Sequence, residues 1–291
     1  MDDPARSGPL TAGEPAASTR DAVRIPVDLD ASLVFVRHGE SELIVERRFQ
    51  GQLESPLSAT GRRQAALVAG RLARPHDRPA LPLPAGRPLA IVHSPLGRAA
   101  ATASAIQAAA SAPDAFDGPI PIRPDPRFVE IGQGEWEGLP STEIAARDGE
   151  RLAAWRRTPT VAWAPGGERL AEVQARVAPS LADLLTELSE AGRPGSIDAP
   201  QVAGYRDPVP DHPWTILVAH DGVFKVVLLT LFDLPLERFW MWTMDLAAIT
   251  VVEFRAGRPV LRAHNLTGHL APLLDEAAQQ EQEERSRSGA L

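Results

Sequence analysis

The chain has 291 residues, a formal net charge of −8 at neutral pH, no cysteine and 44% hydrophobic residues. Without cysteine, neither a disulfide framework nor a cysteine-ligated zinc site can form. Proteins that bind polyanions usually carry a basic excess, so the acidic balance argues against nucleic-acid binding. The length is sufficient for one large domain or two small ones with a substantial core.

The acidic excess is concentrated at the two ends of the chain. Residues 1–30 and 271–291 each hold three more acidic than basic residues, and the segment between them is nearly balanced. We expect a disordered N-terminal arm over 1–30, which lacks apolar periodicity, and an acidic tail over 271–291. No signal-peptide pattern and no sufficiently long apolar run is present, so we expect a cytoplasmic protein without membrane contact.

After the arm, the sequence predicts strands that alternate with helices. A buried strand is expected at residues 32–37, because the run SLVFVR is almost wholly apolar. The next helix follows Ser58 or Thr60, either of which can cap it. A proline-rich loop then precedes a second buried strand at 89–93 and an alanine-rich helix at 98–110.

The middle of the chain is less regular. A short third strand is predicted at 120–123, and the glycine-rich residues 128–140 are expected to form a loop. Two helical patterns follow, around 141–157 and 168–190. Residues 192–213 are rich in proline and glycine and have no periodicity, so we expect a flexible surface insertion there.

The last predicted elements complete an α/β domain. A fourth strand is expected at 214–219, a helix at 223–232, and a hairpin that pairs 248–254 with 259–264. Strands alternating with helices predict a three-layer α/β/α sandwich with a mostly parallel sheet. We assign this domain to residues 31–270.

Distinctive polar residues follow the predicted strands. Arg37 and His38 follow the first strand, Arg98 comes shortly after the second, and His220 follows the fourth. Glu130 lies in the loop after the third. Ligands of parallel α/β sheets bind outside the carboxyl ends of the strands, so we expect these residues to converge on one site.

Two histidines, two arginines and a carboxylate suit a tetrahedral dianion better than a metal ion. Arginine donors match phosphate oxygens, and a neutral histidine can hold a phosphoryl group covalently. A carboxylic acid can protonate the leaving oxygen and then deprotonate water or an alcohol. The histidines show no metal-ligand spacing, so we predict no metal and no cofactor.

A series of sequence blocks resembles the histidine phosphatase superfamily, in its phosphoglycerate mutase-like family. The blocks, in order, are VRHGE, RFQG, SPLS, GRRQA, SPLGRA, EIGQGEWEG, PGGE and VAHDG. The resemblance spans residues 32–270. It implies a phosphoglycerate mutase-like fold and a metal-independent phosphatase that acts on a small phosphomonoester.

The same resemblance implies roles for individual residues. His38 corresponds to the nucleophile that forms a phosphohistidine, and Arg37, Arg98 and His220 correspond to the rest of the phosphate pocket. The structural alternatives are that the two arginines belong to surface ion pairs and that His220 is a core histidine.

The loop residues carry less specific signals. The resemblance implies that Glu130 is the proton donor, although Glu135 and Glu137 of the same loop are alternatives. Gln50 and Gly51 correspond to substrate-binding residues, but they could also simply shape a turn.

Two positions depart from the family pattern. Ile44 stands where the family commonly has an asparagine that donates to the phosphate, and loss of one such donor can cost about 10²–10³ in rate. Arg47 or Arg48 could replace that donor. Asp221 stands where many relatives have glycine, and we expect its carboxylate to point away from the phosphate.

Three functions remain open at this stage. We favour hydrolysis over a 2,3-bisphosphoglycerate-dependent phosphoglycerate mutase, because the segment between Trp136 and Gly167 is short and a mutase must enclose the phosphoenzyme against water. The third possibility, a phosphoester-binding protein with weak or no turnover, is motivated by Ile44. The oligomeric state is left open, with a homodimer as one possibility.

The tryptophans are expected to be packing residues and not a platform on which bases stack. We expect the stretch of residues 239–244 to belong to the core and not to a subunit interface. The tryptophans concerned are Trp155, Trp163, Trp240 and Trp242.

Overall fold

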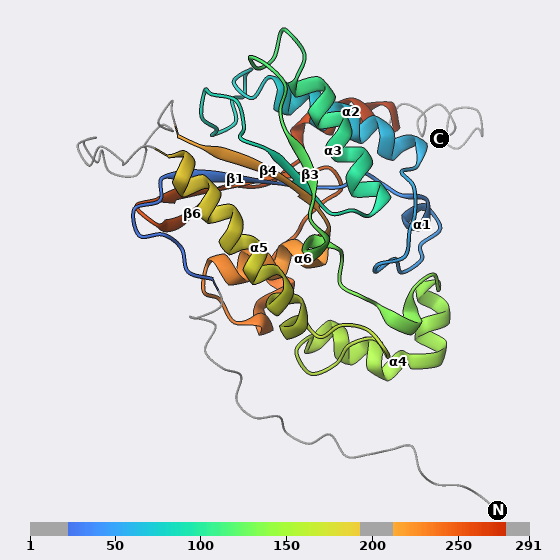
Figure 1. The fold of residues 1–291 in the computed structure, drawn as a ribbon. Helices are drawn as coiled ribbons and strands as arrows, with labels where there is room; N and C mark the ends of the chain where they lie inside the picture. Colours follow the sequence, from blue (N-terminus) through green and yellow to red (C-terminus); the bar gives the residue numbers. More distant parts are fainter. Residues whose placement is uncertain (1–22, 193–211, 278–291) are drawn as a thin grey trace, which may run out of the picture.

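A six-stranded sheet forms the centre of the computed structural model, which describes residues 23–192 and 212–277 (Figure 1). The spatial order of the strands is β3-β2-β4-β1-β5-β6. β1 to β4 are parallel to one another, and the β5–β6 hairpin is antiparallel. The strands are β1 (Ala31–Arg37), β2 (Ile91–His93), β3 (Ile122–Pro124), β4 (Trp214–Ala219), β5 (Ile249–Arg255) and β6 (Arg258–Leu266).

Helices cover both faces of this sheet (Figure 1). Successive residues of β1 point to opposite faces. Val34 and Val36 therefore belong to the core that contains α2 and α3, whereas Leu33 and Phe35 belong to the core that contains α5 and α6. This confirms the predicted three-layer sandwich. The helices are α1 (Glu42–Val45), α2 (Ala59–Ala73), α3 (Gly97–Ala110), α4 (Ser141–Arg157), α5 (Leu170–Ala191) and α6 (Asp221–Leu231).

Local sequence signals account for most element boundaries. The Ser58 hydroxyl accepts a hydrogen bond from Gly61 N and caps α2. Of the two candidates that the sequence offers for this cap, Ser58 is therefore the one used. Several elements begin one or two residues away from the predicted positions. The third strand begins two residues later than predicted, and Ile120 packs in the core outside it. α1 has four residues, too few to produce a detectable helical period.

Short 3-10 helices form the remaining regular structure in the described residues. They lie in segments expected to be loops or packing stretches, where three to six residues carry no clear periodicity. They are η2 (Pro126–Phe128), η3 (Gly134–Trp136), η4 (Leu236–Met241) and η5 (Gly268–Leu270).

The N-terminal boundary at residue 31 needs correction. Val23 and Ile25 pack against the core, and Leu29 is only 2% exposed. Asp30 Oδ1 accepts a hydrogen bond from Ala256 N in the β5–β6 turn at 2.9 Å. The prediction of a disordered arm is therefore wrong for residues 23–30, because three apolar side chains find tertiary partners that local periodicity does not reveal.

The other predicted flanking segments are only partly described. The insertion predicted at 192–213 lies almost wholly outside the described residues, as does most of the C-terminal tail. Residues 271–277 are helical, and Glu276 forms an ion pair with Arg63 at 2.6 Å. Across the part of the chain that the structure describes, no helix combines the length and apolarity needed to cross a membrane.

Candidate active site

Strand register brings the two predicted site histidines together. Arg37 of β1 is paired with Ala219 of β4, so the next residues along the parallel strands, His38 and His220, are neighbours. Their ring centroids are 5.0 Å apart, and both side chains are buried. The pairing of these two adjacent parallel strands thus places two imidazoles side by side at the carboxyl ends of the strands.

The surroundings of His38 define its neutral tautomer. Nδ1 lies 2.6 Å from Gly39 O. A carbonyl oxygen can only accept, so Nδ1 carries the proton and Nε2 keeps its lone pair. Arg98 Nε lies 3.3 Å from that Nε2. Burial, followed by the positive charges of Arg98 and Arg37, lowers the pKa of His38 well below its ordinary value, so the ring is held neutral.

His220 caps α6 and contacts β2. Its Nε2 is 2.7 Å from the hydroxyl oxygen of Ser94, which follows β2 directly. Its Nδ1 is buried and makes no hydrogen bond within the described residues. When Ser94 donates to Nε2, Nδ1 carries the proton and can donate to an anion. Burial, followed by electrostatic interaction with the nearby His38 ring and with Arg98, lowers the pKa of His220 well below its usual value.

The two predicted phosphate-binding arginines differ in the number of hydrogen bonds that hold their guanidinium groups. Arg98 is 1% exposed and donates from Nη1 to Leu53 O at 2.9 Å and from Nη2 to Gly51 O at 2.8 Å. Arg37 donates from Nη1 to Met244 O at 2.5 Å, whereas its buried Nε has no partner among the described residues. Neither arginine forms an ion pair with a described residue, so the alternative that both belong to surface ion pairs is wrong. Both positive charges are therefore available to a dianion.

Glu130 lies at the N-terminus of α6. Its Oε1 accepts from Ile131 N at 2.8 Å and from Val223 N at 3.0 Å, and its Oε2 accepts from Gly222 N at 3.1 Å. Oε2 keeps a lone pair and can carry a proton. Burial, followed by the charge of Asp221, raises the pKa of Glu130 above its ordinary value, which favours the acid form.

Gly222 permits this approach. A side-chain carbon at that position would lie 2.7 Å from Glu130 Oε1 and 2.7 Å from Ile131 Cδ1. Glycine at the start of α6 is therefore required for the Glu130 carboxyl group to reach the helix terminus.

The loop with Gln50 and Gly51 covers the site from the side of α1. Gln50 Oε1 accepts from the Ser41 hydroxyl at 2.7 Å. Gly51 has a φ of +51°, and a β-carbon there would collide with the Glu137 side chain. Glu137 Oε1 accepts from Gln52 N and Gln133 N, both at 2.9 Å. Glu137 therefore joins two loops of the site wall, which explains its presence in the same block as Glu130.

A cavity of about 390 Å³ is lined by six of the seven predicted site residues, and His220, which is buried beside His38, is not among its lining residues. Its volume falls within the range of about 300–1,000 Å³ that is usual for small-molecule sites. It is lined by Arg37, His38, Phe49, Gln50, Gly51, Arg98, Glu130, Ile131, Gln133, Trp155, Arg156, Asp221, Gly222, Phe239 and Trp240.

The outer wall of this cavity is formed by α4 and η4. The sequence places residues 139–165, which contain α4, among those expected to line the mouth of the site, but it does not indicate η4. Trp155 and Phe239 are buried and contact each other, as expected of packing residues, but both also line the cavity. The prediction that residues 239–244 form core is wrong for Trp240 and Met241, which are 44% and 54% exposed. No sequence signal could have identified the η4 part of the wall, because η4 meets α4 only through tertiary packing.

The two residues that depart from the family pattern, Ile44 and Asp221, differ in their position relative to the cavity. Neither Ile44 nor the two arginines considered as replacements, Arg47 and Arg48, line the cavity. Asp221 does line it, and its Oδ2 lies 2.7 Å from Lys225 Nζ. The charge of Asp221 is thus balanced by the only lysine of the chain, which is nearly buried, and the expected orientation of its carboxylate away from the phosphate stays a prediction.

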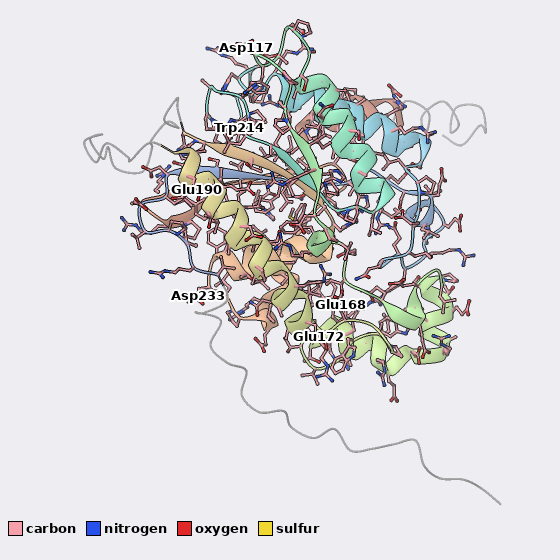
Figure 2. All side chains as sticks on the ribbon, viewed as in Figure 1. Asp117, Glu168, Glu172, Glu190, Trp214 and Asp233 are labelled. Carbon is pink, nitrogen blue, oxygen red and sulfur yellow. The ribbon has the colours of Figure 1, made fainter. Side chains whose placement is uncertain are left out.

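A polar network lies beneath the Glu130 loop. Arg176 of α5 donates from Nη1 to Arg127 O at 2.7 Å and from Nη2 to Glu130 O at 2.9 Å. Its Nε contacts Glu168 Oε1 at 2.8 Å, and Glu168 Oε2 accepts from Gly132 N at 2.8 Å. Figure 2 shows Glu168 at the beginning of α5. Glu168, the last residue of the PGGE block, therefore fixes the loop that carries Glu130.

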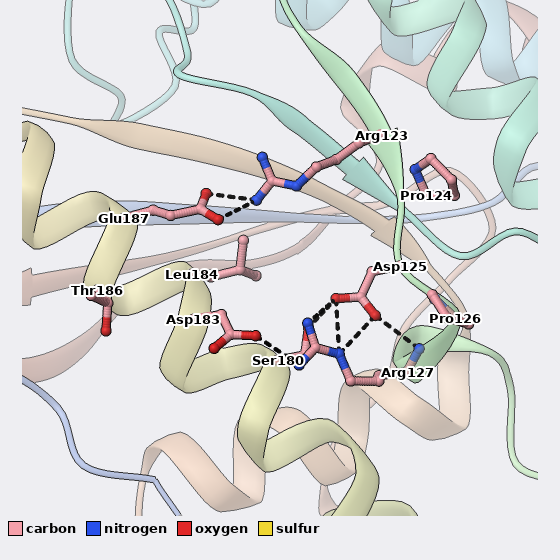
Figure 3. Close-up of a pocket in the computed structure, with 10 residues that line it drawn as sticks. All are labelled: Arg123, Pro124, Asp125, Pro126, Arg127, Ser180, Asp183, Leu184, Thr186 and Glu187. Carbon is pink, nitrogen blue, oxygen red and sulfur yellow. Dashed lines mark hydrogen bonds and ion pairs between the residues drawn. The ribbon is translucent and has the colours of Figure 1, made fainter.

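A second cavity, of about 580 Å³, lies between β3, η2 and α5 (Figure 3). Its charged groups are paired with one another. Arg123 binds both carboxylate oxygens of Glu187, and Arg127 binds Asp125 and Asp183. None of the predicted site residues lines it. With its arginines already paired, this cavity is less suited to an anion than the first one.

Within the described residues, no group of three or more histidine, cysteine, aspartate or glutamate side chains has the arrangement of a metal site. The arrangement at the first cavity combines a neutral imidazole nitrogen, two unpaired guanidinium groups and a carboxyl group with a raised pKa. These groups can bind a phosphate dianion, attack it and supply a proton.

Comparisons with known proteins agree with this chemistry. Residues 33–192 and 203–267 match the histidine phosphatase superfamily (branch 1). A glucosyl-3-phosphoglycerate phosphatase of Mycolicibacterium vanbaalenii is 35% identical over 209 residues, which cover 71% of this chain and 76% of the relative. Phosphoserine phosphatase 1 of Hydrogenobacter thermophilus is 27% identical over 249 residues, 84% of this chain and 97% of the relative.

A solved structure extends the agreement to the fold. The mycobacterial glucosyl-3-phosphoglycerate phosphatase in complex with VO3 superimposes with a TM-score of 0.64 at 30% sequence identity. The match covers 81% of this chain and 100% of that one. The chain belongs to branch 1 of the histidine phosphatase superfamily, and it is a phosphatase of that superfamily.

Proposed function

We propose that the chain hydrolyses phosphate monoesters through a phosphohistidine on His38, with Glu130 as the proton donor. The observation that carries this proposal is the state of His38. Its Nδ1 proton is committed to Gly39 O, and its Nε2 lone pair lies beside Arg98 in a cavity. An unprotonated nitrogen next to a guanidinium group is suited to attack on an anionic phosphorus centre.

In the first step, the Nε2 lone pair of His38 forms a bond to phosphorus while the ester P–O bond breaks. Arg37 and Arg98 neutralise the charge on the phosphoryl oxygens. The proton on Glu130 Oε2 passes to the leaving alkoxide, so the alcohol departs neutral.

In the second step, Glu130 acts as the base. Its carboxylate takes a proton from water, and the resulting hydroxide oxygen bonds to phosphorus while the P–N bond breaks. Inorganic phosphate leaves, His38 regains its lone pair, and Glu130 is protonated again.

We propose small phosphorylated metabolites as substrates, with glucosyl-3-phosphoglycerate, phosphoserine and 3-phosphoglycerate as the first candidates to assay. Relatives named for action on the first two are similar to this chain over most of its length. The predicted cytoplasmic location stays a prediction.

The test is phosphate release from 3-phosphoglycerate and p-nitrophenyl phosphate in EDTA, with and without a bisphosphate primer. We expect release with both substrates, independent of metal, and its loss in His38→Ala. Isomerisation of 3-phosphoglycerate without phosphate release would instead identify a mutase. Binding without turnover, together with activity gained in Ile44→Asn, would identify the chain as an impaired phosphoester-binding protein.

A further inference from the structure

The loop of residues 242–248, which joins η4 to β5, contacts two successive residues of the active site through its backbone. Arg37 Nη1 donates to Met244 O at 2.5 Å, and Ala247 N donates to His38 O at 3.2 Å. Because Arg37 Nε has no partner among the described residues, the position of Met244 O decides where this guanidinium group lies. Such placement matters, since a displacement of about 1 Å can cost about 10² in rate.

A β-bulge in β6 brings a polar side chain to this loop. Thr250 of β5 faces two residues of β6, His264 and Asn265, because the register shifts between Ile249 and Val251. Asn265 has a φ of +54°, in the left-handed region that asparagine tolerates better than most residues, and its N–H donates to Thr250 Oγ1 at 3.0 Å. Bulges of this kind re-aim side chains next to active sites.

The side-chain amide of Asn265 makes two hydrogen bonds with Asp245. Its Oδ1 accepts from Asp245 N at 2.7 Å, and its Nδ2 donates to Asp245 Oδ2 at 2.8 Å. Asp245 N and Met244 O belong to the same planar peptide group. Asn265 therefore binds the N–H of the peptide group whose carbonyl oxygen accepts from Arg37, and each of these hydrogen bonds polarises the peptide group in favour of the other.

We propose that Asn265 is a positioning residue, which fixes the Arg37 guanidinium group against the phosphoryl group through the peptide group that joins Met244 to Asp245. This inference rests on the proposed phosphatase function and adds to it the residue that orients one of the two phosphate-binding arginines. The β5–β6 hairpin thereby supports the site from outside the cavity, since Asn265 is not one of the residues that line it.

A structural alternative is that Asn265 only permits the bulge through its backbone conformation. Asn265→Gly distinguishes the two roles, because glycine adopts a positive φ readily but has no side-chain amide. Asp30→Ala is the matched control. It removes a side-chain hydrogen bond to the turn of the same hairpin, from Ala256 N to Asp30 Oδ1 at 2.9 Å, and leaves the loop of residues 242–248 untouched.

The first measurement is kcat/KM for p-nitrophenyl phosphate. We expect Asn265→Gly to lower it about tenfold, because Arg37 is then held less precisely, and Asp30→Ala to leave it unchanged. Asn265→Asp should also lower it, because two carboxylates then face each other. Adding Asp245→Asn to Asn265→Asp restores a donor opposite a carboxylate, and we expect this exchange to recover most of the activity.

A double-mutant cycle with Arg37→Met separates positioning from a general loss of structure. In the Arg37→Met protein, Asn265→Gly should cost no further activity, because the group that it positions is already gone. An equal fold loss with and without the Arg37 side chain would overturn the role of Asn265. An unchanged kcat/KM in Asn265→Gly, or no recovery when the two side chains are exchanged, would overturn it as well.

Binding of inorganic phosphate, measured by calorimetry, makes the comparison without turnover. We expect Asn265→Gly to weaken this binding about tenfold and Asp30→Ala to leave it unchanged, and equal affinities of Asn265→Gly and the unmodified protein would contradict the proposal. If Asn265 fails these tests, phosphate release that disappears in His38→Ala still supports the phosphatase function. If the unmodified protein shows no turnover, weaker phosphate binding in Asn265→Gly still supports the role of Asn265.

Discussion

At the scale of single residues, burial moves the pKa values of the proposed nucleophile and the proposed acid in opposite directions. The pKa of His38 is lowered, which favours an unprotonated Nε2, and that of Glu130 is raised, which favours its acid form. Both shifts favour the protonation states that the first step requires. When the pH is below the pKa of the histidine, its ring is protonated and cannot act as a nucleophile. When the pH is above the pKa of the carboxyl group, that group has lost its proton and cannot act as an acid.

We therefore expect a bell-shaped dependence of kcat/KM on pH for an alkyl phosphate. The acid limb follows His38 and lies below its ordinary pKa of 6.5, and the alkaline limb follows Glu130 and lies above its ordinary 4.5. Glu130→Gln should remove the alkaline limb and lower kcat/KM, which reports the steps up to departure of the alcohol, about 10²–10⁴-fold. With p-nitrophenyl phosphate the loss should be much smaller, because that leaving group needs little protonation.

An equal loss for the two substrates would show that Glu130 has another role. The second ionisation of the substrate, near pH 6, also affects the pH profile. Because it is the same for the variant and the unmodified enzyme on one ester, comparing their two profiles isolates the limbs that are due to groups of the enzyme.

At the scale of elements, α5 positions the acid loop through one side chain. Arg176 binds the carbonyl oxygens of Arg127 and Glu130 and also binds Glu168, which holds Gly132 N. The loop has little regular structure of its own. Its position relative to α6, and so the reach of the Glu130 carboxyl group, depends on these contacts.

We expect Arg176→Met to lower kcat/KM for an alkyl phosphate by about tenfold or more, with little change in kcat/KM for p-nitrophenyl phosphate, because kcat/KM reports the steps up to departure of the alcohol and a displaced acid matters most for a poor leaving group. Arg123→Met is the control. It removes the exposed β3–α5 ion pair with Glu187 and leaves the Glu130 loop contacts intact. If both variants lost the same activity on both esters, Arg176 would have a purely structural role.

The elements also show which parts of the structure could be predicted from sequence. The Ser58 cap, the apolar strand at 32–37 and the β5–β6 hairpin depend on local signals, and each was confirmed. The inner site could be anticipated because its residues follow strand ends, where sheet register brings His38 and His220 together. Trp240 could not be placed there, because its approach depends on how η4 packs against α4.

At the scale of the whole molecule, buried neutral histidines link stability to pH. Burial lowers the pKa values of His38, His220, His264 and His269 in the folded chain, so the unfolded chain binds protons first as the pH falls. The raised pKa of Glu130 acts in the opposite direction, but for one group only. More protons bind to the unfolded state, so stability rises with pH in this range.

The free energy of unfolding should therefore fall as the pH drops below about 6.5 and towards the lowered pKa values of the folded histidines. The slope is about 1.4 kcal/mol per pH unit for each extra proton bound by the unfolded chain. Urea unfolding at a series of pH values measures it. The His38→Asn protein should show a shallower slope, and a slope independent of His38 would contradict its burial in the neutral form.

The charge of the whole molecule is unevenly distributed along the chain. The acidic excess that argued against anionic ligands is concentrated at the ends of the chain, and the first cavity instead gathers three arginines. Net charge therefore describes the surface of this protein better than its site.

The central claim is that Nε2 of His38 carries the phosphoryl group. The most direct measurement is rapid quenching of the enzyme during turnover, followed by peptide mapping under alkaline conditions, in which phosphohistidine is retained. We predict one phosphorylated histidine, His38, modified at Nε2 because Nδ1 is bound to Gly39 O. Turnover without phosphorylation of His38, or with phosphate at its Nδ1, would contradict the account.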